Sequence, residues 1–140
     1  MSSLTFILSL VVAAEHLYIM YLETFATTSK RTARTFNLSE VALENGNVQV
    51  LFKNQGVYNG LIAIALLYGL FLSHQQTEMV AIFLIFVIIV ALYGSLTSSK
   101  SILLKQGGPA ILALISLFFL RNPYRMRKMF LFLFNHKNLM

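Results

Sequence analysis

The run from Met79 to Leu96 limits the fold most strongly, because its 18 residues carry no charged side chain. A helix of that length extends about 27 Å at the usual rise per residue, close to the thickness of a bilayer's hydrocarbon core. Three other apolar runs of similar length occur in the chain. With 57% hydrophobic and only 11% charged residues, the chain is too apolar for a soluble globule. These features predict an all-α integral membrane protein.

We predict a four-helix antiparallel bundle whose spans cover residues 4–23, 48–73, 78–97 and 101–120. The first run lacks the basic start of a signal peptide, so we interpret it as an uncleaved span. Before the second span, residues 37–44 are typical of a short capped helix at the membrane interface. Residues 1–120 are expected to form one transmembrane domain. Residues 121–140 are expected to form a basic amphipathic tail on the membrane surface.

Composition and motifs exclude several classes of site. The chain has no cysteine, which rules out disulfides, thiolate metal sites and cysteine nucleophiles. No paired-histidine metal motif, phosphate-binding loop or nucleophile elbow is present, so no metal site is predicted. The formal charge of +6 comes from basic clusters beside apolar runs, a pattern that favours anionic lipid headgroups as partners. No aromatic and basic platform for nucleic acid accompanies those clusters.

A polar run, residues 53–60, leads into the second apolar span. At helical spacing Gln55 and Asn59 share one face, while Gly56 and Gly60 leave a smooth notch. Amides at this depth need partners from protein groups or trapped water, because lipid supplies none. We therefore expect another segment of the chain to approach the second span here.

Antiparallel connection places polar residues of all four spans in the half of the bilayer that holds the first and third loops. The other half is expected to be almost wholly apolar. Glu23 ends the first span, where solvation at the interface is the simpler interpretation. The polar chamber predicted in this way comprises Glu15, His16, Tyr18, Glu23, Asn54, Gln55, Tyr58, Asn59, Tyr93 and Gln106.

Glu15 and His16 are the candidate catalytic, proton-handling pair, and the other eight residues are candidate ligand-binding groups. An acid in mid-span opposes insertion by about 2.5–3.5 kcal/mol, which makes a functional role the default interpretation. We predict that Glu15 or His16 lies within hydrogen-bonding reach, directly or through one water, of Gln55, Tyr58 or Asn59. The structural alternative is that these groups only bind the helices together.

Four segments carry a resemblance to a known family. They are EHLYIMYLE at 15–23, NQGVYNG at 54–60, YGSLT at 93–97 and QGGPA at 106–110. In this order they resemble the small bacterial integral membrane proteins grouped as domain of unknown function 1304, over roughly residues 5–118. The resemblance implies a four-helix bacterial inner-membrane protein and transfers no activity. The basic tail is longer than is usual for that family.

Three functions fit these features. The first is a membrane-embedded chamber that binds or chemically converts a small lipophilic molecule. The second is a small proton-coupled transporter that acts as a homo-oligomer, since four short helices enclose little volume alone. The third is a structural or regulatory subunit without chemistry of its own.

Solvent access to the polar cluster separates the first two functions from the third, and transport in sealed vesicles separates the second from the first. The sequence identifies no cofactor and leaves open whether the protein is an enzyme.

The basic residues are divided almost equally between the two sides of the predicted bundle. Six basic residues lie on the side of the first and third loops and five on the side of the termini. The charges that flank the first span usually dominate insertion, and they favour the first loop inside. We therefore expect a multi-pass protein of the bacterial cytoplasmic membrane with both termini outside.

Overall fold

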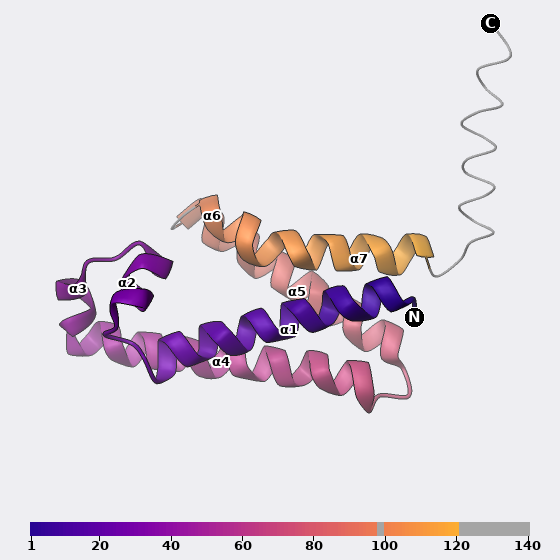
Figure 1. Ribbon diagram of the computed structural model, residues 1–140, viewed down its shortest axis with the longest axis horizontal. Helices are drawn as coiled ribbons and strands as arrows, with labels where there is room; N and C mark the ends of the chain where they lie inside the picture. The colour runs from indigo at the N-terminus through magenta and orange to yellow at the C-terminus, as the bar shows by residue number, and fades with distance from the viewer. Residues whose placement is uncertain (98–99, 121–140) are drawn as a thin grey trace, which may run out of the picture.

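The computed structural model describes residues 1–97 and 100–120, and this part of the chain is helical with short connections (Figure 1). The predicted tail, residues 121–140, lies outside the described residues. In chain order the elements are α1 (Ser3–Thr24), α2 (Lys30–Phe36), α3 (Glu40–Glu44), α4 (Gly46–Phe71), α5 (Gln76–Thr97), α6 (Lys100–Ile102), the π-helix η1 (Leu103–Gly107) and α7 (Gly108–Leu120).

Four helical segments are long and apolar enough to cross a membrane, which confirms the predicted spans. Three of them are α1, α4 and α5, and the fourth runs continuously through α6, η1 and α7. The helix predicted within residues 37–44 is α3, which Ser39 caps by accepting a hydrogen bond from the Ala42 amide. The separate helix α2 was not predicted. It is capped by the following residue, Asn37, whose left-handed backbone (φ 57°) is a common helix terminator.

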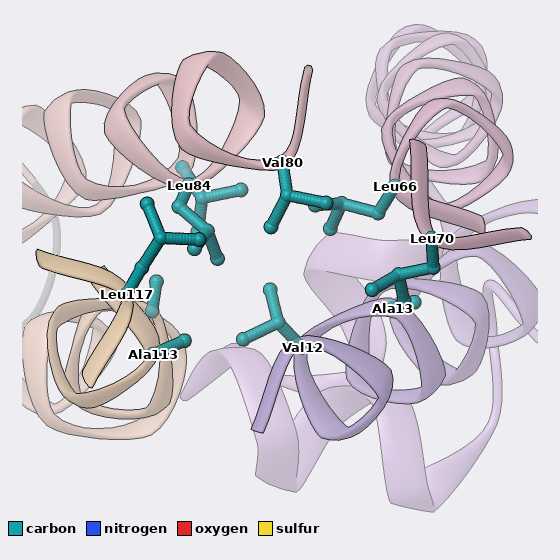
Figure 2. Close-up of a cluster of buried hydrophobic side chains, with 10 residues drawn as sticks. Val12, Ala13, Leu66, Leu70, Val80, Leu84, Ala113 and Leu117 are labelled. Carbon is teal, nitrogen blue, oxygen red and sulfur yellow. The ribbon is translucent and has the colours of Figure 1, made fainter. Parts of the chain in front are cut away.

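The spans form an antiparallel ring in which α1 packs on α4, α4 on α5, α5 on α7 and α7 on α1. Their apolar faces meet at the end of the bundle near the N-terminus. There Leu66 of α4 and Val80 of α5 point toward each other, and Leu70 of α4 lies next to Ala13 of α1 (Figure 2). These side chains are almost completely buried. Packing of this core holds the four spans together at one end.

Three small hydroxyl side chains are also buried at this end, so the expectation of an almost wholly apolar half is wrong there. They belong to Thr5, Ser9 and Ser116. The Ser116 hydroxyl of α7 lies 2.9 Å from Thr5 Oγ1 of α1 and 2.8 Å from the Ala113 carbonyl oxygen. Small hydroxyl residues allow two helices to approach closely and to share a hydrogen bond across the contact.

The opposite end of the bundle, which carries the first loop, is less tightly closed. Figure 1 shows α4 and α5 diverging from the turn that joins them, with α2 and α3 lying beyond the far end of α1. Two cavities lie at this end, and the polar residues singled out from the sequence gather around them.

Candidate functional site

The glycine notch of α4 sets how closely α1 approaches. A Cβ atom on Gly56 would collide with Thr24 Oγ1 and would lie 3.1 Å from Glu23 Cβ, and one on Gly60 would lie 3.1 Å from Met20 Cγ. Both glycines are buried against α1. The two backbones therefore come close to each other near the end of α1, as the notch predicted.

This close approach brings Glu23 of α1 against Asn59 of α4. The Asn59 side-chain amide donates a hydrogen bond to Glu23 Oε2 at 2.7 Å and another to the Gln55 carbonyl oxygen at 3.1 Å. Glu23 is only 6% exposed, so its interpretation as a solvated interfacial residue is wrong. A hydrogen bond to a buried carboxylate is stronger than one between neutral groups, so this contact joins α1 to α4 firmly.

Hydroxyl groups hold the chain that follows α1 over the same end of the bundle. Thr27 Oγ1 donates to the Glu23 carbonyl oxygen at 2.7 Å, and Thr32 Oγ1 lies 2.6 Å from the Ala26 carbonyl oxygen. These contacts satisfy carbonyl groups that lie at or beyond the end of the helix. They also fix the start of α2, whose last residue, Phe36, packs edge-on against Phe52 of α4 with ring centroids 5.1 Å apart.

The last span begins with a π-helical turn that shapes the other wall of the site. In an α-helix the amide at position 109 would bond to the Lys105 carbonyl, but Pro109 has no amide hydrogen. The wider turn η1, Leu103–Gly107, precedes this proline and contains Gln106. Such single π turns occur often at functional sites.

The first cavity lies between α4 and α5 and has a volume of about 710 Å³. Polar side chains line its end near the first loop, where Glu23, Gln55, Asn59 and Gln106 are found. Its deeper walls are apolar. They comprise Leu61, Ile62 and Ala65 of α4 and Phe83, Phe86 and Val90 of α5.

The second cavity, of about 490 Å³, lies between α1 and the start of the last span, next to the end of α2. Glu15, Tyr18 and Ile19 of α1 face Lys105 and Gln106 of η1 across it. The remaining lining residues are Thr35, Phe36, Asn37, Leu38, Phe52, Ser101 and Ile102. Glu15 Oε2 is buried and has no hydrogen-bond partner.

The structure therefore divides the predicted single chamber into two. Phe36, Ile102 and Gln106 line both cavities and form the wall between them. Of the predicted residues, Glu23, Gln55, Tyr58, Asn59 and Gln106 line the first cavity, while Glu15, Tyr18 and Gln106 line the second. Phe36 was not singled out from the sequence, because an aromatic residue after a basic stretch carries no signal of its own.

Three predicted residues line neither of these two cavities. Asn54 is exposed on α4, and Tyr93 is 68% exposed on α5. His16 is buried, and its Nδ1 lies 2.9 Å from the Val12 carbonyl oxygen, so this nitrogen carries the hydrogen and donates. The imidazole therefore bonds within its own helix.

The predicted contact between the first two spans forms at a different carboxylate. Asn59 binds Glu23, which lies about two helical turns beyond Glu15 and His16 along α1. Within residues 1–97 and 100–120, neither Glu15 nor His16 hydrogen-bonds directly to Gln55, Tyr58 or Asn59. The notch at Gly56 explains the difference, since it places the closest approach of the two helices at Thr24 and Glu23.

The part of the chain that the structure describes contains no set of side chains that could ligate a metal ion. No group of three or more histidine, aspartate or glutamate side chains comes together there. The polar side chains that line the two cavities carry amide, carboxylate, hydroxyl and ammonium groups. Such groups can orient an organic molecule by hydrogen bonds and charge.

Comparison with known proteins identifies the family of this chain but assigns no activity to it. A family described as "Protein of unknown function (DUF1304)" matches residues 10–118, a range that includes both cavities. The uncharacterized protein YpaA of Lactococcus lactis subsp. lactis (strain IL1403) is 63% identical over 119 residues, which make up 85% of this chain and 100% of the relative. No solved structure matches the chain.

Proposed function

The chain belongs to the family of proteins of unknown function DUF1304, and from its own geometry we propose that it binds a small lipophilic molecule in the first cavity. One observation carries this proposal. A cavity of about 710 Å³ between two spans has hydrogen-bonding groups at one end and apolar walls at the other. Its volume falls within the usual range for sites that take small organic molecules.

The order of groups along the cavity gives the ligand its orientation. Gln55 and Asn59 line the end near the first loop. Ala65 lies about 9 Å deeper than Asn59 along α4 at the usual helical rise. A ligand with a polar head and an apolar body fits this order with its head toward the first loop. The Asn59 amide is already shared between Glu23 and the Gln55 carbonyl, so the head is held by the Gln55 and Gln106 amides and the free Glu23 lone pairs.

Exposure of the lining residues supports entry from the lipid. Leu61 and Phe86, on the facing helices α4 and α5, are 56% and 50% exposed. In a membrane these surfaces face hydrocarbon, so the cavity opens toward the acyl chains. A lipophilic molecule already dissolved in the bilayer reaches such a site without crossing water.

Filling the apolar end of the cavity is expected to abolish binding. Ala65→Phe places a ring where the ligand's body would lie. We expect this change to reduce photolabelling by a long-chain alcohol that carries a diazirine in its alkyl chain by at least tenfold. The labelled peptides, identified by mass spectrometry of the protein in lipid nanodiscs, should come from α4 and α5 in the unaltered protein.

The neighbouring residue supplies a matched control. Ile64 is 59% exposed and does not line the first cavity, so Ile64→Phe should leave labelling of α4 and α5 unchanged. Equal labelling of the two variants would mean that the probe only samples the lipid-facing surface. The proposed binding function would then be wrong.

We also propose that the protein is located in the bacterial cytoplasmic membrane with its first loop inside and its termini outside. Six basic residues lie at the first-loop end, and three of them, Lys30, Arg31 and Arg34, follow the first span closely. The six are Lys30, Arg31, Arg34, Lys53, Lys100 and Lys105, and all are exposed. The basic residues that flank the first span usually dominate insertion, and they favour the cytoplasmic side for the first loop.

Labelling of single cysteines tests this orientation, and the absence of native cysteine makes the test simple. Gln75→Cys, in the turn between α4 and α5, should react with a membrane-impermeant maleimide in intact cells. Glu44→Cys, at the end of α3, should react only after the cells are permeabilised. The reverse pattern would place the termini inside.

A further inference from the structure

Two charged groups of opposite sign face the second cavity without bonding to each other. Glu15 of α1 and Lys105 of η1 both line it, and Glu15 Oε2 is buried with no hydrogen-bond partner. In the described part of the chain no ion pair joins the two side chains. An unpartnered buried carboxylate oxygen is strongly disfavoured, so a donor that meets it gains more than an exposed contact would.

We propose that the second cavity binds a small zwitterion with an apolar body, of the amino-acid class. Its ammonium group would meet Glu15, and its anionic group would meet Lys105. Charge-assisted hydrogen bonds of this kind are roughly twice as strong as neutral ones. The site is separate from the first cavity, so this proposal does not rest on the function proposed above.

The remaining lining residues fit the rest of such a molecule. Ile19, Phe36 and Phe52 supply apolar and aromatic walls, and Asn37 adds an amide near the first-loop end. Apolar walls with a few placed polar groups are typical of sites for small organic ligands. A zwitterion with an apolar or aromatic side chain satisfies both kinds of surface at once.

Depth distinguishes a free zwitterion from the headgroup of a lipid. Glu15 lies about 13 Å below the end of α1 at Thr24, whereas Lys105 lies about 7 Å below the start of α6 at Lys100. The ligand's ammonium therefore sits deeper than its anion. In an ethanolamine phospholipid that enters from the same side, the phosphate lies nearer the acyl chains than the ammonium does, which gives the opposite order. The geometry favours a soluble zwitterion that enters from the first-loop side with its ammonium first.

Three related probes separate the two charges. L-Phenylalanine carries both, its methyl ester lacks the anion, and N-acetyl-L-phenylalanine lacks the ammonium. We expect the full chain, in nanodiscs free of ethanolamine lipid, to bind L-phenylalanine at least tenfold more tightly than either blocked form. Isothermal titration calorimetry or equilibrium dialysis measures these affinities.

Two variants assign each charge to its partner. In Glu15→Gln the protein should no longer bind L-phenylalanine more tightly than N-acetyl-L-phenylalanine. In Lys105→Gln it should no longer bind L-phenylalanine more tightly than the methyl ester. Glu44→Gln and Lys53→Gln change exposed residues that do not line this cavity, so they should leave all three affinities unchanged. Retained thermal unfolding transitions would show that the variants remain folded.

Three outcomes would overturn the proposal. Equal binding of the three probes would show that charge plays no part. Tighter binding of lysophosphatidylethanolamine than of L-phenylalanine, lost in both variants, would assign the site to a lipid headgroup. If no probe binds, and each single variant lowers stability while the double variant restores it, Glu15 and Lys105 pair with each other instead. None of these outcomes would bear on photolabelling of the first cavity, which uses an uncharged probe.

Discussion

Replacing Gly56 by alanine is expected to lower the free energy of unfolding by about 3 kcal/mol, toward the upper end of the usual effect of overpacking. The added methyl group would collide with Thr24 Oγ1 and would lie 3.1 Å from both Glu23 Cβ and the Thr24 backbone nitrogen. A flexible side chain can move aside, but the backbone of α1 cannot do so without separating the two helices. Unfolding of the purified protein in mixed detergent micelles, followed by circular dichroism, measures the loss.

Gly46→Ala is the matched control for this substitution. Gly46 is the first residue of α4, its φ is not positive, and a Cβ placed on it would have no neighbour within 4 Å. Alanine there is expected to be neutral or to stabilise by up to about 1 kcal/mol, because glycine is a poor helix former. A similar loss in both variants would mean that the notch does not set the distance between α1 and α4.

A double variant tests which atom resists the added methyl group. Thr24→Ala removes the hydroxyl that meets the new Cβ but leaves the backbone contact in place. Combining it with Gly56→Ala should recover part of the stability, about half, because only one of the two obstacles is gone. The Thr24 hydroxyl is buried and has no hydrogen-bond partner, so Thr24→Ala alone should have little effect.

The positions of the spans could be predicted from the sequence because each depends on a local property. A run such as 79–96 has a length and an apolar content that fit a bilayer whatever its neighbours are. The notch at Gly56 and Gly60 was predictable for the same reason, since helical spacing alone places both residues on one face. The structure confirms that this face packs against α1.

The partner that meets the notch could not be predicted, because it depends on how far α1 slides along α4. Glu15 and His16 were the predicted partners, and only the packed helices show that Glu23 meets Asn59 instead. The direction of the His16 ring was also hidden. Its hydrogen bond to the Val12 carbonyl within the same helix competes with any bond across the bundle.

The division of the polar region into two cavities depends on the loop and therefore could not be predicted. It results from Phe36 at the end of the short helix α2, which lines both cavities together with Ile102 and Gln106 of the last span. Nothing in residues 24–36 indicates that this stretch folds back instead of extending into water. The hydroxyl contacts of Thr27 and Thr32 that cause the fold-back each depend on the tertiary arrangement after α1 ends.

Asn59→Asp is expected to produce the other large effect, a loss of about 3 kcal/mol in the free energy of unfolding. The change replaces the amide that donates to Glu23 Oε2 at 2.7 Å with a second carboxylate at the same place. Two buried carboxyl groups at this distance either repel each other as anions or must take up a proton, and both lower the stability of the folded state near neutral pH. The Gln55 carbonyl oxygen also loses the hydrogen bond that Asn59 supplies.

Glu23→Gln alone should have a much smaller effect, about 1 kcal/mol, because a glutamine oxygen can still accept the hydrogen bond from Asn59. In the double variant Glu23→Gln with Asn59→Asp, the amide and the carboxylate exchange helices. The glutamine amide introduced at position 23 can donate to the new carboxylate, so most of the stability lost in Asn59→Asp should return. Recovery stays incomplete, because the Gln55 carbonyl oxygen still lacks its donor.

Thermal unfolding of the unaltered protein, the two single variants and the double variant completes a double-mutant cycle. Photolabelling of the first cavity is measured on the same four samples. If the Glu23–Asn59 contact only fastens α1 to α4, the exchanged pair should restore both stability and labelling. If Glu23 also holds the ligand's polar head through its carboxylate, the exchanged pair should be stable but label at least tenfold less. Additive losses, with no recovery in the double variant, would show that the two side chains do not form the contact on which the first cavity is built.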